Sequence, residues 1–177
     1  MVITKASRHV VAPNSAYFFD TNVWLFIYGP VAGTNQRKQG IYSRLLKDII
    51  SHNAVVFVSS LVLSEYINAV LHIGFKQWKR ITGNTNASFK HDYRITDDYL
   101  DRLNEAILQV QEILKVCNKR PDDFHIVNID SILGLMNHDA DYNDSYYIHD
   151  CQEIGLKLVS DDSDMQNVQS PITLITA

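Results

Sequence analysis

Four acidic side chains in this sequence follow or adjoin short apolar runs that are expected to form strands. In a parallel α/β sheet, ligand and catalytic groups gather beyond the carboxyl ends of the strands, so these side chains would lie together there. Four neighbouring carboxylates repel one another unless a cation neutralises them, and their oxygens are the hard ligands that Mg²⁺ and Mn²⁺ prefer. The pattern therefore predicts a divalent-metal site suited to phosphate chemistry. The four residues are Asp20, Glu65, Asp144 and Asp162.

The first two acids also have purely structural interpretations. Asp20 follows an apolar run and could cap the next helix, although Thr21 or Asn22 could serve as that cap instead. Glu65 could be an ordinary exposed helix residue, as most glutamates are. Its apolar neighbours predict a mostly buried helix, so a glutamate here must face a polar cavity or the solvent edge.

The last two acids have structural alternatives of their own. Asp144 could complete a capping box in which Asp141 is the cap, and a helix that starts at a strand-end cleft can still supply a metal ligand. Asp162 has two competitors in the same tight turn, Asp161 and Asp164. The residue types alone leave the choice among these three open.

Strands of four to six residues alternate with helices, which predicts a three-layer α/β/α fold around a central, mainly parallel sheet of about five strands. Residues 1–177 are expected to form one domain, which begins with an irregular segment at 1–15. The strands are expected at residues 16–19, 54–58, 124–129, 156–160 and 172–175. Helices are expected at residues 24–28, 35–52, from Ser59–Ser60 onward, 97–117, 131–137 and 144–154.

Composition narrows the class of protein. The chain has 177 residues, 46% of them hydrophobic, which is enough for one well-formed core. No apolar run reaches the roughly 20 residues that span a bilayer, and no secretory signal is visible. The two cysteines, Cys117 and Cys151, are interpreted as buried small hydrophobic residues in a reducing compartment. The expected location is the cytoplasm, without membrane association.

Charge is unevenly distributed although the net charge is only −4. Residues 139–164 carry a local −7 and residues 74–94 a local +4, as expected for a metal site beside a surface that binds a polyanion. The basic segment interleaves cations with aromatic rings, a composition typical of surfaces that bind single-stranded RNA. The alternative is that Trp78 and Tyr93 belong to the core and the cations are merely solvated. The candidate RNA contacts are Lys79, Arg80 and Lys90.

Three motifs in this order resemble the PIN-domain family. Residues 18–23 are similar to the family's first strand, which ends in Asp followed by a small polar residue and Asn. Residues 64–66 match its second acidic position, and residues 144–162 match its last acidic helix, Gly, strand and final Asp. The resemblance covers about residues 17–175 and favours Asp162 over Asp164, with Asp161 in the variable place. Such domains often have another acidic or polar residue where Asp164 stands, so Asp164 is a further candidate metal ligand. It also implies that Asn22 and Ser160 hold water or orient the acids, the alternative being helix or turn capping.

The resemblance implies an endoribonuclease that uses Mg²⁺ or Mn²⁺ and leaves 5′-phosphate and 3′-hydroxyl ends. A lone small PIN domain is most similar to the VapC-like toxin of a VapBC-type toxin–antitoxin pair, which implies a homodimer and a small antitoxin that blocks the cleft. Residues 74–95 are longer than in the smallest members, so the substrate is not transferred from them.

Two other classes of protein fit less well. A phosphatase of the haloacid-dehalogenase type also begins with a strand ending in Asp, but needs a second Asp where Asn22 stands. A non-catalytic PIN-like scaffold would bind RNA or protein only, and the presence of all four acids argues against it.

Overall fold

A six-stranded, fully parallel sheet forms the centre of the computed structural model, which describes residues 1–121 and 124–177. The strand order is β1-β6-β5-β2-β3-β4. The chain begins at the edge strand β1 and enters the middle of the sheet at β2. It continues outward through β3 to β4 on one side, and then through β5 to β6, which lies beside β1, on the other. The strands are β1 (Val2–Lys5), β2 (Ala16–Phe19), β3 (Val55–Val58), β4 (Asn118–Lys119), β5 (Lys157–Val159) and β6 (Thr173–Thr176).

The central strands form because nearly every residue in them is apolar. Tyr17, Phe18 and Phe19 of β2 are almost fully buried, as are Leu158 and Val159 of β5. Apolar side chains on both faces of a strand are typical of a parallel sheet that is covered by helices on both sides. The predicted α/β class is therefore confirmed.

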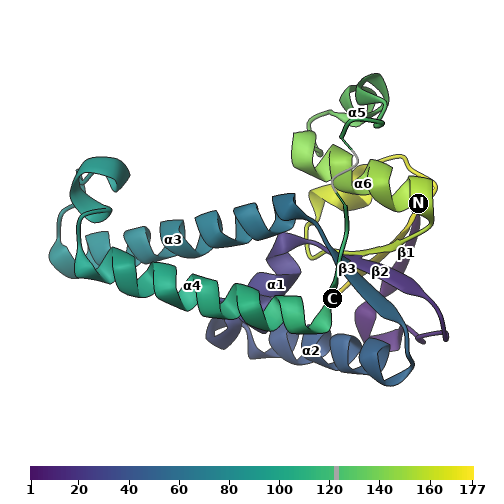
Figure 1. The fold of residues 1–177 in the computed structure, drawn as a ribbon, viewed down its shortest axis with the longest axis horizontal. Helices are drawn as coiled ribbons and strands as arrows, with labels where there is room; N and C mark the ends of the chain where they lie inside the picture. The colour runs from purple at the N-terminus through teal and green to yellow at the C-terminus, as the bar shows by residue number, and fades with distance from the viewer. Residues whose placement is uncertain (122–123) are drawn as a thin grey trace.

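Helices cover the sheet on both faces, so the fold has three layers (Figure 1). In the view of Figure 1, α2 lies on one side of the sheet and α6 with α5 on the other. The α-helices are α1 (Thr21–Ile27), α2 (Gln36–Ser51), α3 (Ser60–Thr82), α4 (Asp97–Val116), α5 (Ile129–Leu135) and α6 (Tyr142–Ile154). The shorter helical segments are η1 (Ala6–Arg8), η2 (Ala32–Thr34), η3 (Phe89–Tyr93) and η4 (Asp164–Asn167).

The long helices α3 and α4 pack along each other and project away from the sheet as an arm (Figure 1). Ser59 caps α3 and Thr96 caps α4 through their side-chain oxygens, as the sequence predicts for both helix starts. Near the tip of the arm, Tyr93 is fully buried in a second small core that also contains Trp78. The expectation that these two aromatics are core residues is confirmed.

Two predictions about strands are wrong. Residues 1–15 were expected to be irregular, but they contain β1, which pairs with β6 at the edge of the sheet. Residues 124–129 were expected to form a strand, but residues 124–126 form a turn and α5 begins at Ile129 after its cap, Asn128. The position beside β3 is taken instead by the two-residue strand β4.

No helix within the described residues combines the length and apolar character that crossing a bilayer requires.

Candidate metal centre

Asp20 lies directly after β2, the strand at which the direction of chain connection reverses. Its backbone N–H donates to the carbonyl of Val159 at 2.9 Å, which extends the pairing of β2 with β5 by one residue. The crevice beyond the strand ends at such a reversal is the usual ligand site of an open parallel sheet. Only 6% of Asp20 is exposed. Its carboxylate is therefore held in the interior at the edge where ligands are expected.

Asp20 is also the N-cap of α1, because the backbone N–H of Thr21 donates to its Oδ1. Of the three residues that the sequence offered as this cap, Asp20 therefore has the role, and Thr21 and Asn22 do not. Asn22 Nδ2 instead donates to Asp20 Oδ2 at 2.6 Å, and Ser160 Oγ donates to the same oxygen at 2.7 Å. Asn22 and Ser160 thus fix the orientation of the Asp20 carboxylate.

Burial in this position changes the acidity of Asp20. Its pKa is raised to about 7, chiefly because burial disfavours the charged form and further because of the charges of Asp144 and Glu65. Hydrogen bonds from Ser160 and from the backbone of Thr21 oppose the rise. At neutral pH the group is consequently close to half-protonated, which is a state that an incoming cation can shift toward the carboxylate.

Glu65 lies near the start of α3, where three donors hold its carboxylate. Asn143 Nδ2 donates to Oε1, while Tyr147 Oη and Thr21 Oγ1 donate to Oε2 at 2.5 and 2.8 Å. Burial and the hydrogen bond to Glu65 both raise the pKa of Tyr147, so its hydroxyl remains a donor at physiological pH. Thr21 contacts both Asp20 and Glu65 and therefore connects the β2 end to α3.

Asp144 lies in the first turn of α6. Asp141 and Asp144 form the predicted capping box, in which the backbone N–H of each residue is paired with the other's side chain. The pKa of Asp144 is raised to about 6 by partial burial and by the charges of Asp141, Asp162 and Glu65, against a hydrogen bond from the Asp141 backbone. The capping role therefore coexists with a position among the other acids.

The three acids after β5 have different environments. Asp162 follows Ser160, whose Oγ accepts the Asp162 backbone N–H at 3.1 Å, and its charge acts on Asp144. Asp161 points elsewhere, because it forms an ion pair with Lys38 and accepts a hydrogen bond from Tyr42 at 2.8 Å. Asp164 is exposed and begins η4. Its backbone N–H donates to Asp162 Oδ1 at 2.9 Å.

The four main acids are thus neighbours, but they are not arranged as metal ligands. Within residues 1–121 and 124–177, no three His, Cys, Asp or Glu side chains converge closely enough to hold one ion. Within the same ranges, none of the four carboxylates forms an ion pair with a lysine or arginine. The donor set consists of carboxylate oxygens that repel one another and have no basic partner among the described residues. Asp20 is buried and the other three acids are half-buried. Such a set fits a hard divalent cation.

The candidate RNA contacts lie far from this centre. Fourteen residues of α3 separate Glu65 from Lys79, which corresponds to about 21 Å along the helix axis. Lys79 Nζ donates to the Thr85 carbonyl at 3.1 Å and lies over the Phe75 ring. Arg80 and Lys90 belong to the same distal part of the arm and are exposed. The structure does not bring these cations to the acids.

Two polar residues of the site, Asn143 and Tyr147, were not identified from the sequence. Both hold Glu65, although they are 78 and 82 residues from it along the chain. A helix counted from Asp141 as its cap would have placed Asn143 and Tyr147 four residues apart on one face. That spacing was the available signal, but it does not show what the face contacts.

Comparison with known proteins identifies related sequences and folds. A sequence profile described as "PIN domain" matches residues 17–170. A search of curated proteins found no match. A solved structure described as the "Crystal Structure of PAE2754 from Pyrobaculum aerophilum" is similar at 14% identity, with 92% of each chain covered and a TM-score of 0.47.

Proposed function

Since the chain belongs to the PIN-domain family, whose members are generally nucleases, we propose that it is a divalent-metal-dependent endoribonuclease. The observation that carries this proposal is the buried acid centre at the end of β2. Asp20, with its pKa raised to about 7, is surrounded by the charges of Asp144 and Glu65 and has no basic partner among the described residues.

The side chains of the centre would each have a defined part in the reaction. Asp20, Glu65, Asp144 and Asp162 would hold one or two Mg²⁺ or Mn²⁺ ions. A bound cation of this kind lowers the pKa of a water molecule and neutralises charge on the phosphate oxygens. Asn22 and Ser160 hold Asp20 in place, so its carboxylate does not have to reorganise when the substrate arrives.

The basic residues around the centre support a role for a cation. Lys38 reaches this edge of the sheet, where it already forms an ion pair with Asp161. Without an added cation, the negative charge that develops on a bound phosphate would lie next to a group of carboxylates. Cleavage of a polyanion here therefore requires an additional positive charge, which supports metal dependence.

The finer assignment is a VapC-like toxin. We infer that the protein is a homodimer and is inhibited by a small antitoxin that covers the acid centre. Induced expression in a bacterial host should then arrest growth, whereas expression of the Asp20→Asn variant should not. Growth arrest by both proteins would separate toxicity from the acid centre and contradict the toxin assignment.

Cleavage of labelled RNA tests the proposed activity. The wild-type protein should cut a single-stranded RNA in Mg²⁺ or Mn²⁺, lose activity in a chelator, and regain it when metal is restored. Asp20→Asn should reduce the cleavage rate at least 100-fold, because it removes one ligand charge from the centre. Asp101→Asn is the matched control, since it changes an exposed acid of α4 away from the centre and should retain most activity.

The products and the control define the outcomes that contradict the proposal. New ends that carry a 5′-phosphate can be ligated directly, so ligation of the products should succeed without a kinase. Cleavage that continues in chelator, or that Asp20→Asn and Asp101→Asn affect equally, would contradict the assignment of the acid centre.

A further inference from the structure

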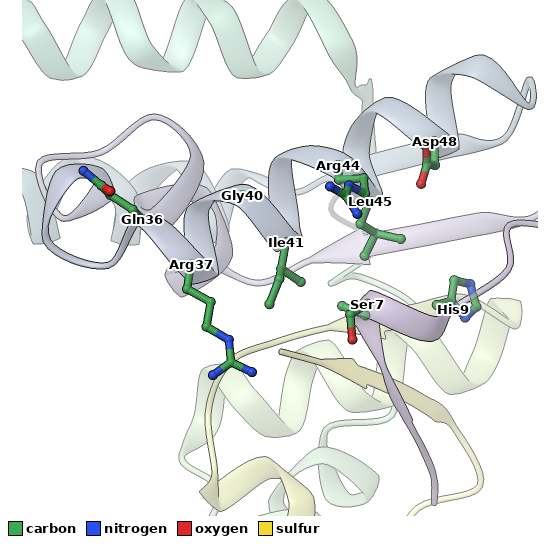
Figure 2. Close-up of a pocket in the computed structure, with 10 residues that line it drawn as sticks. Ser7, His9, Gln36, Arg37, Gly40, Ile41, Arg44, Leu45 and Asp48 are labelled. Carbon is green, nitrogen blue, oxygen red and sulfur yellow. The ribbon is translucent and has the colours of Figure 1, made fainter.

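A second polar pocket lies outside the acid centre, between α2 and the segment that follows β1 (Figure 2). Its volume is about 300 Å³. Ser7 and His9 line it from the N-terminal segment, while Gln36, Arg37 and Arg44 line it from α2. In Figure 2, Arg37 extends from α2 toward the side of the pocket that Ser7 occupies. None of these residues belongs to the acid centre.

Positive charge in this pocket has no partner from the chain. Within the described residues, neither Arg37 nor Arg44 forms an ion pair or a side-chain hydrogen bond. The two residues are seven positions apart on one helix, so they lie about 10.5 Å apart along its axis. Asp48 lines the pocket one turn beyond Arg44. The Arg37 end is therefore the more positive end and favours an anion.

The floor of the pocket is partly apolar. Gly40 and Ile41 lie between the two arginines on α2, whereas Leu45 follows Arg44 and is only 2% exposed. A Cβ atom added at Gly40 would meet nothing within 4 Å, so no packing in this chain requires glycine there. Glycine is among the least favourable residues for a helix interior. Its presence at this position leaves space over the apolar floor.

The helix that carries the positive end of the pocket also contacts the rim of the acid centre. Lys38 of α2 is paired with Asp161, and Asp161 precedes Asp162 of the centre. A strand that leaves the acids past the Lys38–Asp161 pair would run onto α2, the helix that carries both arginines. The distal end of the α3–α4 arm offers no such continuity.

We propose that this pocket binds one nucleotide of the RNA strand away from the cleaved bond, with its phosphate between Arg37 and Arg44 and its base over Gly40 and Ile41. The assignment rests on the proposed function, since it takes RNA as the ligand. A free mononucleotide carries the same chemistry, and the experiment includes it as a separate ligand.

Binding of a fluorescent 20-nucleotide single-stranded RNA in chelator tests the charges. The double variant Arg37→Gln/Arg44→Gln should bind about tenfold more weakly than wild type. The slope of log K against log salt should fall by about 0.7, because the two arginines share one phosphate and each phosphate contact to a single strand contributes about 0.7. The matched control Lys47→Gln/Lys115→Gln removes the same charge from exposed positions outside the pocket and should leave the slope unchanged.

Filling the pocket without changing charge provides a second test. Gly40→Leu should weaken RNA binding severalfold while it preserves α2, because leucine has a higher helix propensity than glycine. Gly134→Leu is the control, since Gly134 lies in α5 and also faces open space. Circular dichroism melting of each variant verifies that it is folded.

The outcomes distinguish an RNA subsite from a site for a free nucleotide and from a pocket that binds neither. An unchanged affinity and salt slope in the double variant would overturn the proposal, as would equal effects of the pocket and control variants. Micromolar binding of adenosine monophosphate that requires Arg37, with RNA affinity unaffected, would assign the pocket to a free nucleotide and overturn the RNA subsite. Because binding is measured without metal, absence of RNA cleavage would contradict the proposed function but leave this measurement interpretable.

Discussion

Replacing Asp20 with Asn should change how the stability of the metal-free protein depends on pH. The Asp20 carboxyl has a pKa raised from 3.8 to about 7, mainly by burial and secondarily by the Asp144 and Glu65 charges. Between pH 3.8 and about pH 7, the folded state therefore keeps a proton that the unfolded chain releases. As pH rises through this window, the free energy of unfolding must fall.

The magnitude follows from the size of the shift. About three pKa units correspond to about 4 kcal/mol over the whole window, of which about 2.5 kcal/mol falls between pH 5 and pH 8. Asp20→Asn cannot titrate and should lose this part of the slope. Asp144 titrates in the same direction, but burial, Asp141, Asp162 and Glu65 raise its pKa, so its contribution should be similar in both proteins.

Urea denaturation in chelator at pH 5, 6, 7 and 8 measures this difference. The gap between the two unfolding free energies should move by about 2.5 kcal/mol in favour of the variant from pH 5 to pH 8. Asp164→Asn should run parallel to wild type, since that side chain is exposed. Parallel curves for wild type and Asp20→Asn would refute the reasoning that Asp20 is buried without a compensating charge.

Two further substitutions test other parts of the structure. Tyr147→Phe removes one of the three donors to Glu65 and should weaken Mn²⁺ affinity about tenfold in calorimetry with little change in fold; unchanged affinity would show that the hydroxyl does not position Glu65. Gly74→Ala should destabilise the protein by about 1–3 kcal/mol in urea denaturation, because its Cβ would lie 2.7 Å from Tyr93 Oη; wild-type stability would show that the Tyr93 side chain can move away from α3 at little cost.

The sequence predicted those elements whose signal is local. The strands β2, β3 and β5 are short apolar runs, and the caps Ser59 and Thr96 precede periodic apolar helices. The strands that were missed depend on their neighbours. β1 is exposed at three of its four residues and becomes a strand only by pairing with β6, while β4 consists of two exposed residues.

Residues 124–129 illustrate the opposite error. Their apolar content resembles that of a buried strand, but Asn128 caps α5, and Phe124 and Ile126 are 57% and 72% exposed. The residue types of a short apolar run do not determine whether the run will be buried. The position beside β3 is occupied by β4, whose two residues are both polar.

The acids of the centre could be predicted from the sequence, but the residues that hold their side chains could not. Asp20 and Asp144 follow motifs that can be read along the chain, and both have raised pKa values in the structure. The contacts of Asn143 and Tyr147 with Glu65 join α6 to α3 across a tertiary interface. No periodicity within one element contains that information.

The central claim is that the buried carboxylate of Asp20 and the half-buried acids around it capture a divalent cation. Anomalous scattering from crystals grown with Mn²⁺ tests it most directly. We predict a peak within about 2.1 Å of oxygens from Asp20 and at least one of Asp144, Glu65 and Asp162. Crystals in which these four side chains contact no Mn²⁺ at saturating concentration would contradict it.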